Sequence, residues 1–205
     1  MAQTTSGLRS LLSLAFAYRL FQGMVGAPRT RRALAEEYIR AAPGERVLDI
    51  GCGTAEILEY LPDVDYVGFD QNPRYIESAR RRHAGRGTFF DRSVKDASTG
   101  EIGTFDKVLA LGILHHLDDA EVRDLFGLAK SRLKPGGRLI TFDSCYREGQ
   151  SRIAKFFIDR DRGRNTRTEP AYTALAAEAF PSVRSAVRED LLRIPYTHII
   201  LVCSA

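Results

Sequence analysis

The sequence predicts an α/β fold in which a mostly parallel, seven-stranded sheet carries helices on both faces and ends in an antiparallel hairpin. From Glu45 onward, short apolar runs alternate with helical patterns, an arrangement typical of a parallel sheet. The first run stops at an acid and then at Gly51 and Gly53, where a ligand can approach backbone that carries no Cβ. The last two apolar runs have no helix between them, which predicts the hairpin.

Two helices are predicted before the first strand. Apolar residues recur at spacings of three and four between Leu8 and Phe21, which is the pattern of an amphipathic helix. A second helix is expected from about Arg29 to Arg40, and it stops before the turn sequence Pro43-Gly44. Because both helices precede the sheet in the chain, we expect them to fold over its open edge.

The elements of the sheet follow in regular order. Strands are expected at residues 47–50, 66–69, 87–90, 105–112 and 138–143, with the hairpin at 183–194 and 196–203. Helices are expected at 55–61, 73–82, 118–133 and 171–180. Asn72 is placed to cap the second of these helices ahead of Pro73, and Asp118 or Asp119 to cap the third. Residues 146–169 are polar, rich in arginine and longer than most connections in an α/β core.

Four motifs occur in order over residues 44–145. They are Leu48-Asp49-Ile50-Gly51-Cys52-Gly53, Asp70 at the end of the second strand, Leu114-His115-His116-Leu117 after the fourth, and Leu133-Lys134-Pro135-Gly136-Gly137 before the fifth. Together they resemble the class I S-adenosylmethionine-dependent methyltransferases, a Rossmann-like family, and its small-molecule members of type 11/12. The resemblance implies S-adenosyl-L-methionine as methyl donor and S-adenosyl-L-homocysteine as product. It also implies a catalytic domain at 44–205, a helical cap over the cofactor and acceptor site at 1–43, and an acceptor-side excursion at 146–169.

The resemblance further implies cofactor contacts at the ends of the strands. Asp49 would hold the methionyl ammonium group, and Asp70 would accept hydrogen bonds from the ribose hydroxyls. Asp96 would receive the adenine amino group, although the nearby Asp91 leaves the local register open. Cys52 is also interpreted as a small packing residue. The full set of expected contacts is Asp49, Gly51, Cys52, Gly53, Asp70, Gln71, Asp96, Ala97, Leu111 and Gly112.

His115 and His116 are the candidate catalytic residues, because they follow the fourth strand, where the methyl acceptor would lie. A neutral histidine can remove a proton near neutral pH. Adjacent side chains point apart, so at most one of the two is expected to reach the acceptor. The alternative is that they only support the loop and that alignment of the reactants supplies the rate. His198, on the last strand, is interpreted together with Tyr196 as a packing residue.

Candidate acceptor contacts lie at the end of the fifth strand and in the excursion that follows it. Arginine binds carboxylate and phosphate groups through two parallel hydrogen bonds, so an arginine-rich stretch here favours an anionic or highly polar acceptor. The alternative is a solvated surface loop whose charges are partly cancelled by neighbouring acids. The candidates are Asp143, Arg160, Arg162, Arg164 and Arg167.

Composition limits the class of protein. Of 205 residues, 44% are hydrophobic and 27% are charged, which is ordinary for a soluble globular chain. The net charge of +4 is modest, so no nucleic-acid partner is expected. The apolar run from Leu11 to Phe21 is too short to span a bilayer. The 3 cysteines lack metal-ligand spacing, which predicts a reduced, cytoplasmic protein without a metal site. We expect a monomer or homodimer.

The favoured function is a methyltransferase that acts on a small polar molecule, with O-methylation preferred. Leu111-Gly112-Ile113-Leu114 stands where amino-methylating enzymes often carry an Asn/Asp-Pro-Pro-aromatic segment. Methylation of nitrogen, of a lipid or of a macromolecule stays an alternative, and so does a protein that binds the cofactor without transfer. A nicotinamide-dependent dehydrogenase is disfavoured, because Glu56 stands where the dinucleotide fingerprint needs its third glycine.

Overall fold

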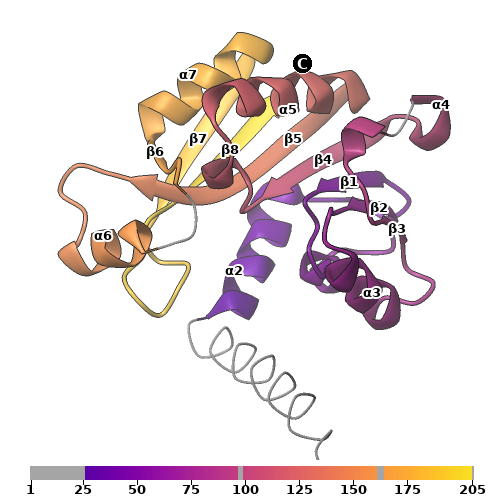
Figure 1. The fold of residues 1–205 in the computed structure, drawn as a ribbon, viewed down its shortest axis with the longest axis horizontal. Coiled ribbons are helices and arrows are strands. Elements are labelled where there is room, and N and C mark those ends of the chain that lie inside the picture. The colour runs from indigo at the N-terminus through magenta and orange to yellow at the C-terminus, as the bar shows by residue number, and fades with distance from the viewer. Residues whose placement is uncertain (1–25, 97–98, 161–163, 205) are drawn as a thin grey trace, which may run out of the picture.

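The computed structural model describes residues 26–96, 99–160 and 164–204, and a single sheet runs through its centre (Figure 1). Strands lie in the order β3-β2-β1-β4-β5-β8-β7, and a short strand, β6, pairs with the end of β5. β1 to β5 are parallel, whereas β8 is antiparallel to both β5 and β7. The predicted sheet with its closing hairpin is therefore confirmed. The bounds are β1 Arg46–Ile50, β2 Asp65–Phe69, β3 Thr88–Phe90, β4 Phe105–Leu111, β5 Leu133–Tyr146, β6 Arg167–Thr168, β7 Ser182–Arg188 and β8 His198–Ser204.

Helices cover both faces of the sheet, as Figure 1 shows. The covering segments are α5 Asp119–Arg132 and α7 Glu169–Ala179 on one face, and α2 Ala27–Ala33, the π-helical η1 Leu34–Ile39, the 3₁₀-helical η2 Glu56–Tyr60 and α3 Pro73–Arg82 on the other. Further short segments are η3 Val94–Asp96, α4 Thr99–Ile102, η4 Leu114–His116 and α6 Arg152–Asp159. The strand order reverses between β1 and β4, which is where ligands bind in open parallel sheets.

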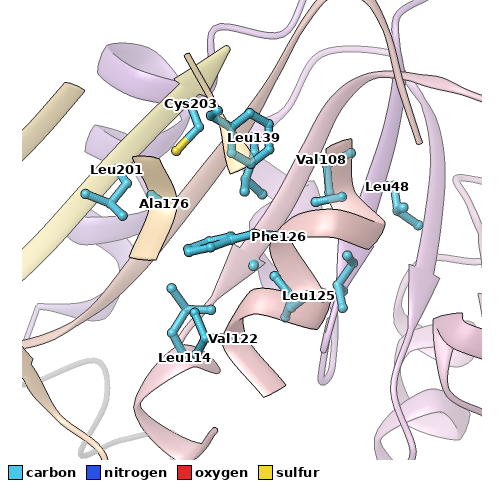
Figure 2. Close-up of a cluster of buried hydrophobic side chains, with 14 of the residues drawn as sticks. Leu48, Val108, Leu114, Val122, Leu125, Phe126, Leu139, Ala176, Leu201 and Cys203 are labelled. Carbon is cyan, nitrogen blue, oxygen red and sulfur yellow. The ribbon is translucent and has the colours of Figure 1, made fainter. Parts of the chain in front are cut away.

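Alternate side chains of each strand enter two separate hydrophobic cores, because neighbouring residues of a strand point to opposite faces. Val108 of β4 and Leu139 of β5 pack with Phe126 of α5 in the first core (Figure 2). Leu109 and Ile140, one residue further along the same strands, belong to the second core. This alternation also fixes which face each residue takes at the end of its strand.

Two helix starts agree with the sequence. Asn72 caps α3 by accepting a hydrogen bond of 3.1 Å from the backbone N–H of Arg74, and Pro73 occupies the first turn. Asp118, rather than Asp119, caps α5. Its carboxylate accepts from the N–H of Glu121, whose carboxylate accepts from the N–H of Asp118, at 2.9 Å in both cases. This reciprocal pair is a capping box.

The helix predicted at 55–61 is shorter than expected. Only the 3₁₀ segment η2 forms there, after Ala55 takes a left-handed conformation with φ of 54°. Leu61 is extended, with ψ of 149°, and the following Pro62 disfavours a helical conformation at that position. The left-handed conformation of Ala55 and the extended Leu61 therefore limit the helix that periodicity alone favours.

The sequence predicts no helix in residues 146–169, but α6 forms there. Ser151 caps it by accepting from the N–H of Ile153 at 3.2 Å. Ala154 and Ile158, four residues apart, form its buried stripe. Ile153 and Phe156 are 55% and 49% exposed, so apolar residues also occupy the outer face and hide the helical period.

At the N-terminus, the expected helix at Leu8–Phe21 lies outside the described residues. The second expected helix, at 29–40, corresponds to α2 and η1 together. It ends at Arg40, whose φ of 47° turns the chain toward β1.

We predict that replacing Ala55 by glycine leaves the free energy of unfolding nearly unchanged. A side chain in the left-handed region costs about 1–2 kcal/mol, which glycine would relieve. Loss of a buried methyl group, about 0.8 kcal/mol, and the greater freedom of unfolded glycine, about 0.4–1 kcal/mol, oppose this gain. Urea denaturation measures the balance.

Ala129→Gly is the matched control. Ala129 is equally buried but lies inside α5, so glycine there loses helix propensity and the methyl group with no strain to relieve. We expect a loss of about 1.5–2 kcal/mol. Equal losses in the two variants would contradict strain at Ala55.

Candidate active site

Two cavities meet at the loop that follows β1. The larger, of about 480 Å³, is lined by this loop, by α2 and η1 on one side, and by the ends of β4, β5 and β8. The smaller, of about 320 Å³, is lined by the ends of β1 and β2, by residues 92–95 and by one side of α5. Gly51 lines both cavities, so a single elongated ligand can extend from one into the other.

Asp49 lies at the larger cavity and is only 2% exposed. Its Oδ2 accepts a hydrogen bond of 2.5 Å from the hydroxyl of Tyr66, whereas Oδ1 is buried and accepts none from the described residues. Burial raises the pKa of Asp49 to about 7; the Tyr66 hydrogen bond opposes this rise, and the charge of Asp70 adds to it. A buried acid with an unsatisfied oxygen favours a cationic group in the adjacent space.

Asp70 fixes the loop after β1. Its Oδ2 accepts the N–H of Gly53 at 2.9 Å, and its Oδ1 accepts the N–H of Asn72 at 2.8 Å. Gly51 has a φ of 74°, and a Cβ there would lie 2.6 Å from a methyl carbon of Ile113, so glycine is required. A carboxylate offers about four acceptor positions, and these two bonds leave the others for a ligand.

The smaller cavity combines apolar walls with polar side chains, among them Asp70 and Gln71. Val94, Ile113 and Leu117 supply apolar walls. Asp96 is exposed and is not among the residues that line either cavity. Ala97 lies outside the described residues.

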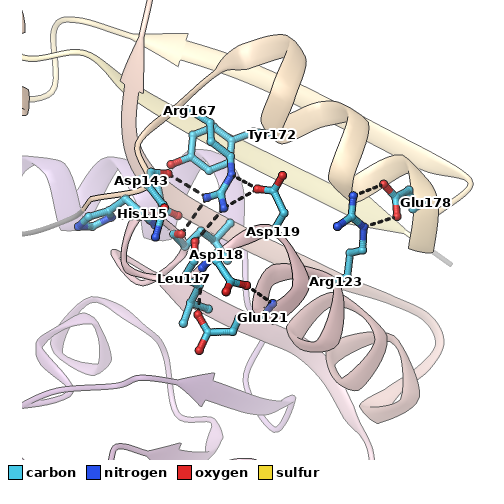
Figure 3. Close-up of polar contacts among 12 residues, drawn as sticks. His115, Leu117, Asp118, Asp119, Glu121, Arg123, Asp143, Arg167, Tyr172 and Glu178 are labelled. Atoms are coloured by element: carbon cyan, nitrogen blue, oxygen red, sulfur yellow. Dashed lines mark hydrogen bonds and ion pairs between the residues drawn. The ribbon is translucent and has the colours of Figure 1, made fainter.

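His115 and His116, the candidate catalytic residues, line neither cavity. Nδ1 of His115 lies 2.7 Å from Oδ1 of Asp143, and both side chains are buried. Asp143 follows Phe142 along β5 and therefore points to the face that α7 covers, where Figure 3 shows it beside Tyr172. Burial raises the pKa of Asp143, although its bond to His115 opposes the rise. His116 is exposed.

His198, interpreted from the sequence as a packing residue, lines the larger cavity. Its ring stacks on that of Phe142, with centroids 4.5 Å apart and planes at 19°. Leu111 and Gly112, expected as cofactor contacts, line the same cavity. In the sequence, the alternation along β8 puts His198 on the same face as Ile200 and Val202. This alternation places His198 at the cavity only once the pairing of β8 with β5 is known.

Comparison with known protein families identifies the domain that contains these residues. Residues 48–139 match a family model described as a methyltransferase domain. The stretch contains Asp49, the loop after β1, Asp70 and β4. Residues 48–139 thus belong to a methyltransferase domain of the S-adenosylmethionine-dependent class I type.

Relatives of this chain include enzymes that are named as O-methyltransferases and as N-methyltransferases. The chain is 34% identical to a ubiquinone biosynthesis O-methyltransferase of Methylocella silvestris, over 63% of this chain and 47% of the relative. It is 30% identical to phosphoethanolamine N-methyltransferase 1 of Arabidopsis thaliana, over 82% of this chain and 35% of the relative. The chain thus spans about half or less of the length of these relatives. The structure of mitomycin 7-O-methyltransferase shares the fold, with a TM-score of 0.66 and 20% identity over 87% of this chain and 53% of that one.

Four arginines of residues 146–169 are candidate acceptor contacts. The three that the structure describes line neither cavity. Arg160 is exposed and stacks over the ring of Phe156 at 3.7 Å. Arg164 is exposed, and Arg162 lies outside the described residues. These positions favour a solvated face over the expected contacts with an anionic acceptor.

Arg167 instead holds the loop that follows β4 (Figure 3). Its guanidinium donates to the carbonyl oxygens of Leu114, Leu117 and Asn165, at 3.1, 2.8 and 2.9 Å. It also donates to the carboxylate of Asp119 at 2.8 Å and is only 9% exposed. Because its N–H groups are used in these contacts, Arg167 stabilises the loop and has none left to bind an acceptor.

We predict that Arg167→Ala lowers the free energy of unfolding by about 2–3 kcal/mol, because it leaves loop carbonyls without their charged donor. Arg164→Ala, the matched control on the exposed part of the same segment, should change it by less than about 0.5 kcal/mol. Thermal and urea denaturation of both variants measure the difference. Unchanged stability of Arg167→Ala, together with a raised KM for an acceptor, would restore Arg167 as an acceptor ligand.

Other features of the described residues bear on cofactor classes. No cluster of three or more His, Cys, Asp or Glu side chains suited to a metal ion occurs among them. Within the same residues, no helix has the length and apolar character to cross a membrane.

Cys52 is half-buried, and its sulfur would lie 2.8 Å from a Cβ at Gly68, so it packs closely against β2. Burial, reinforced by Asp49 and Asp70, raises the pKa of the Cys52 thiol.

Proposed function

We propose that this methyltransferase moves a methyl group from S-adenosylmethionine to an oxygen atom of a small molecule bound in the larger cavity. The unsatisfied Oδ1 of buried Asp49, beside the glycine loop, carries the donor side of this proposal. Leaving a buried acceptor unpaired costs about 1–3 kcal/mol, so a ligand that donates to it gains affinity. The ammonium group of the methyl donor has the required charge and N–H groups.

The other donor contacts follow from the two cavities. Asp70, after its two backbone hydrogen bonds, has lone pairs that would accept the ribose hydroxyls. The slot between Val94 and Leu117 would hold the adenine ring. Because Asp96 lines neither cavity, we assign the adenine edge to residues 93–95 instead. When bound, S-adenosylmethionine supplies an electrophilic methyl group on a positively charged sulfur.

The acceptor would occupy the end of the larger cavity away from Asp49. Leu34, Phe142 and Leu192 are among the apolar residues that line this cavity. About 480 Å³ must hold both the methionyl arm and the acceptor, which favours a small molecule over a macromolecule. α2 and η1 form one side of this cavity, and this supports the interpretation of residues 1–43 as a cap over the site.

Oxygen is the favoured acceptor atom because β4 leads into Leu111-Gly112-Ile113-Leu114 and not into an Asn/Asp-Pro-Pro segment. N-methylation is the second candidate, supported by the match to an N-methyltransferase over 82% of this chain. His115 and His116 are weak candidates for the base, because neither lines the cavity. Transfer of labelled methyl groups to matched hydroxyl and amine compounds tests the choice. Cofactor binding without any transfer would instead indicate a binding protein.

We predict that S-adenosylhomocysteine binds more weakly as the pH falls through about 7. Burial raises the pKa of Asp49 to about 7 in the free protein. The ligand's ammonium group favours the ionised carboxylate. Above this pH Asp49 is already ionised, whereas below it Asp49 must release a proton before the ligand binds. Affinity should fall by up to about tenfold per pH unit on the acid side. Isothermal titration calorimetry between about pH 5.5 and about pH 8.5 measures this effect.

Two variants control this experiment. Asp49→Asn removes the titrating group and should bind weakly with little pH dependence. Tyr66→Phe removes the hydrogen bond that lowers the pKa of Asp49, so the midpoint should move to higher pH. Wild-type affinity that is constant across the range would contradict the contact between Asp49 and the ammonium group.

We predict that Asp70→Ala weakens S-adenosylhomocysteine binding by about 1.5–3 kcal/mol, the value of hydrogen bonds to a charged group. Asp91→Ala, which removes an exposed acid after β3, should bind as the wild type does. Because Asp70 also holds Gly53, the melting temperature of each variant is measured alongside. A folded Asp70→Ala protein with wild-type affinity would exclude the ribose contact.

A further inference from the structure

We infer that α6 docks on a membrane surface that carries anionic lipids, with its exposed apolar side chains inserted among the lipid headgroups. The inference goes beyond the proposed function and does not depend on it. It rests on three observations: exposed apolar side chains gather on one side of α6, basic residues flank them, and the helix lies at an edge of the molecule.

α6 carries most of the large apolar side chains that remain exposed. Among the described residues there are four such side chains, and three of them lie on this one helix. These three, Ile153, Phe156 and Phe157, are 55%, 49% and 36% exposed, and the fourth is Tyr75 of α3. An apolar surface that gathers in one place marks a site for a partner or a membrane.

The three exposed side chains form one stripe along α6. Phe156 and Phe157 follow Ile153 by three and four residues, so all three lie on the same side of a helix with 3.6 residues per turn. Ala154 and Ile158 lie on another side, which is buried against the rest of the molecule. α6 therefore has two apolar sides, and the fold covers only one of them.

Basic side chains flank the stripe. Asp159, the acid of α6, accepts hydrogen bonds from the ammonium group of Lys155 at 2.8 and 3.0 Å, so its charge is compensated within the helix. Between residues 147 and 164 the described basic residues outnumber the acids, which are Glu148 and Asp159. Three exposed arginines belong to this stretch: Arg152, Arg160 and Arg164. An anionic surface complements their charge.

The stripe and the arginines together supply the two signals that membrane binding needs. Apolar side chains of an interfacial helix enter the boundary between headgroups and acyl chains, while basic groups stay at the lipid phosphates. Arg160 stacks its guanidinium over the ring of Phe156 at 3.7 Å. This pair can therefore place an aromatic ring below the headgroups and a phosphate-binding group among them.

A second copy of this chain fits the surface less well than a membrane does. Three side chains that are about half exposed present about 300 Å² of apolar surface. A stable protein interface buries about 800 Å² on each partner. A two-fold contact through α6 would also bring the exposed arginines of both copies together, and like charges repel. A lipid surface imposes neither limit.

α6 lies at an edge of the molecule, close to the larger cavity. Figure 1 shows the helix beyond the end of β5. Ala154 of α6 and residues 192–197 line a cavity of about 340 Å³. Leu192 lines both this cavity and the larger one. Docking through α6 therefore brings the larger cavity close to the membrane.

The chain has no tryptophan, so a single introduced tryptophan reports on its own surroundings. The experiment uses Phe156→Trp in the full chain, with vesicles of phosphatidylcholine alone or of phosphatidylcholine mixed with phosphatidylglycerol. With the mixed vesicles, the emission should shift to shorter wavelength, and the shift should be smaller at high salt. Tyr75→Trp is the matched control, because Tyr75 is also 49% exposed but lies on α3. Its emission should not change.

Sedimentation with the same vesicles measures binding without a fluorescent reporter. Ile153→Ser combined with Phe156→Ser should weaken binding to the mixed vesicles by about tenfold or more, because two apolar side chains lose their contact with lipid. Both residues are exposed, so the melting temperature of this variant should stay near that of the wild type.

A second pair of variants tests the role of charge. Arg160→Gln combined with Arg164→Gln should weaken binding several-fold at low salt and have little effect at high salt. Arg74→Gln combined with Arg81→Gln is the matched control, because it removes two exposed positive charges from α3. The control should bind the mixed vesicles as the wild type does.

Three results would overturn the inference. The first is a wild-type protein that does not bind the mixed vesicles, and the second is equal binding by the wild type and the Ile153 and Phe156 double variant. The third is short-wavelength emission of Phe156→Trp without vesicles. At the mass of a dimer it would show that a second copy covers α6, and at the mass of a monomer that another segment of this chain does. The proposed function fails separately, if the wild type does not bind S-adenosylhomocysteine.

Discussion

The alternation of side chains along the strands is the constraint on which the whole site depends. At the end of β5, Phe142 points into the larger cavity, while Asp143 points toward α7. The antiparallel pairing of β8 then sets His198 on the face of Phe142. His115, bound to Asp143, is held on the other face. A shift of one residue in either register would exchange the two faces and with them the two histidines.

Asp49 and Asp143 show how this constraint gives two similar acids different roles. They are 2% and 1% exposed, and each has one oxygen without a hydrogen bond from the described residues. Asp143 contacts both the ring Nδ1 of His115, at 2.7 Å, and its backbone N–H, at 3.2 Å, whereas Asp49 accepts only from the hydroxyl of Tyr66 among the described residues. A bound cation would therefore stabilise the carboxylate of Asp49 more than that of Asp143, and Asp49 is the one that lines the cavity.

The parts predictable from sequence are those that local chemistry specifies. The cap at Asn72 depends on a residue two positions away, and the bond between Asp70 and the glycine loop joins two neighbouring strand ends only 17 positions apart. The place of His198 depends on a pairing between strands more than fifty residues apart, and no short-range pattern encodes that register. η2 was predicted too long because periodicity does not register the left-handed conformation of Ala55. The arginine-rich composition of the excursion likewise did not reveal what each guanidinium contacts.

Arg167 connects the excursion after β5 to the donor side of the molecule. Its bonds to Leu114 and Leu117 hold the loop after β4, and Leu117 is itself a wall of the smaller cavity. These contacts join residues 53 and 50 positions apart. Disturbing them should therefore loosen the slot proposed for adenine before it affects the distant wall at Phe142. The excursion thus holds the loop that borders the smaller cavity, while β5 and β8 line the larger one.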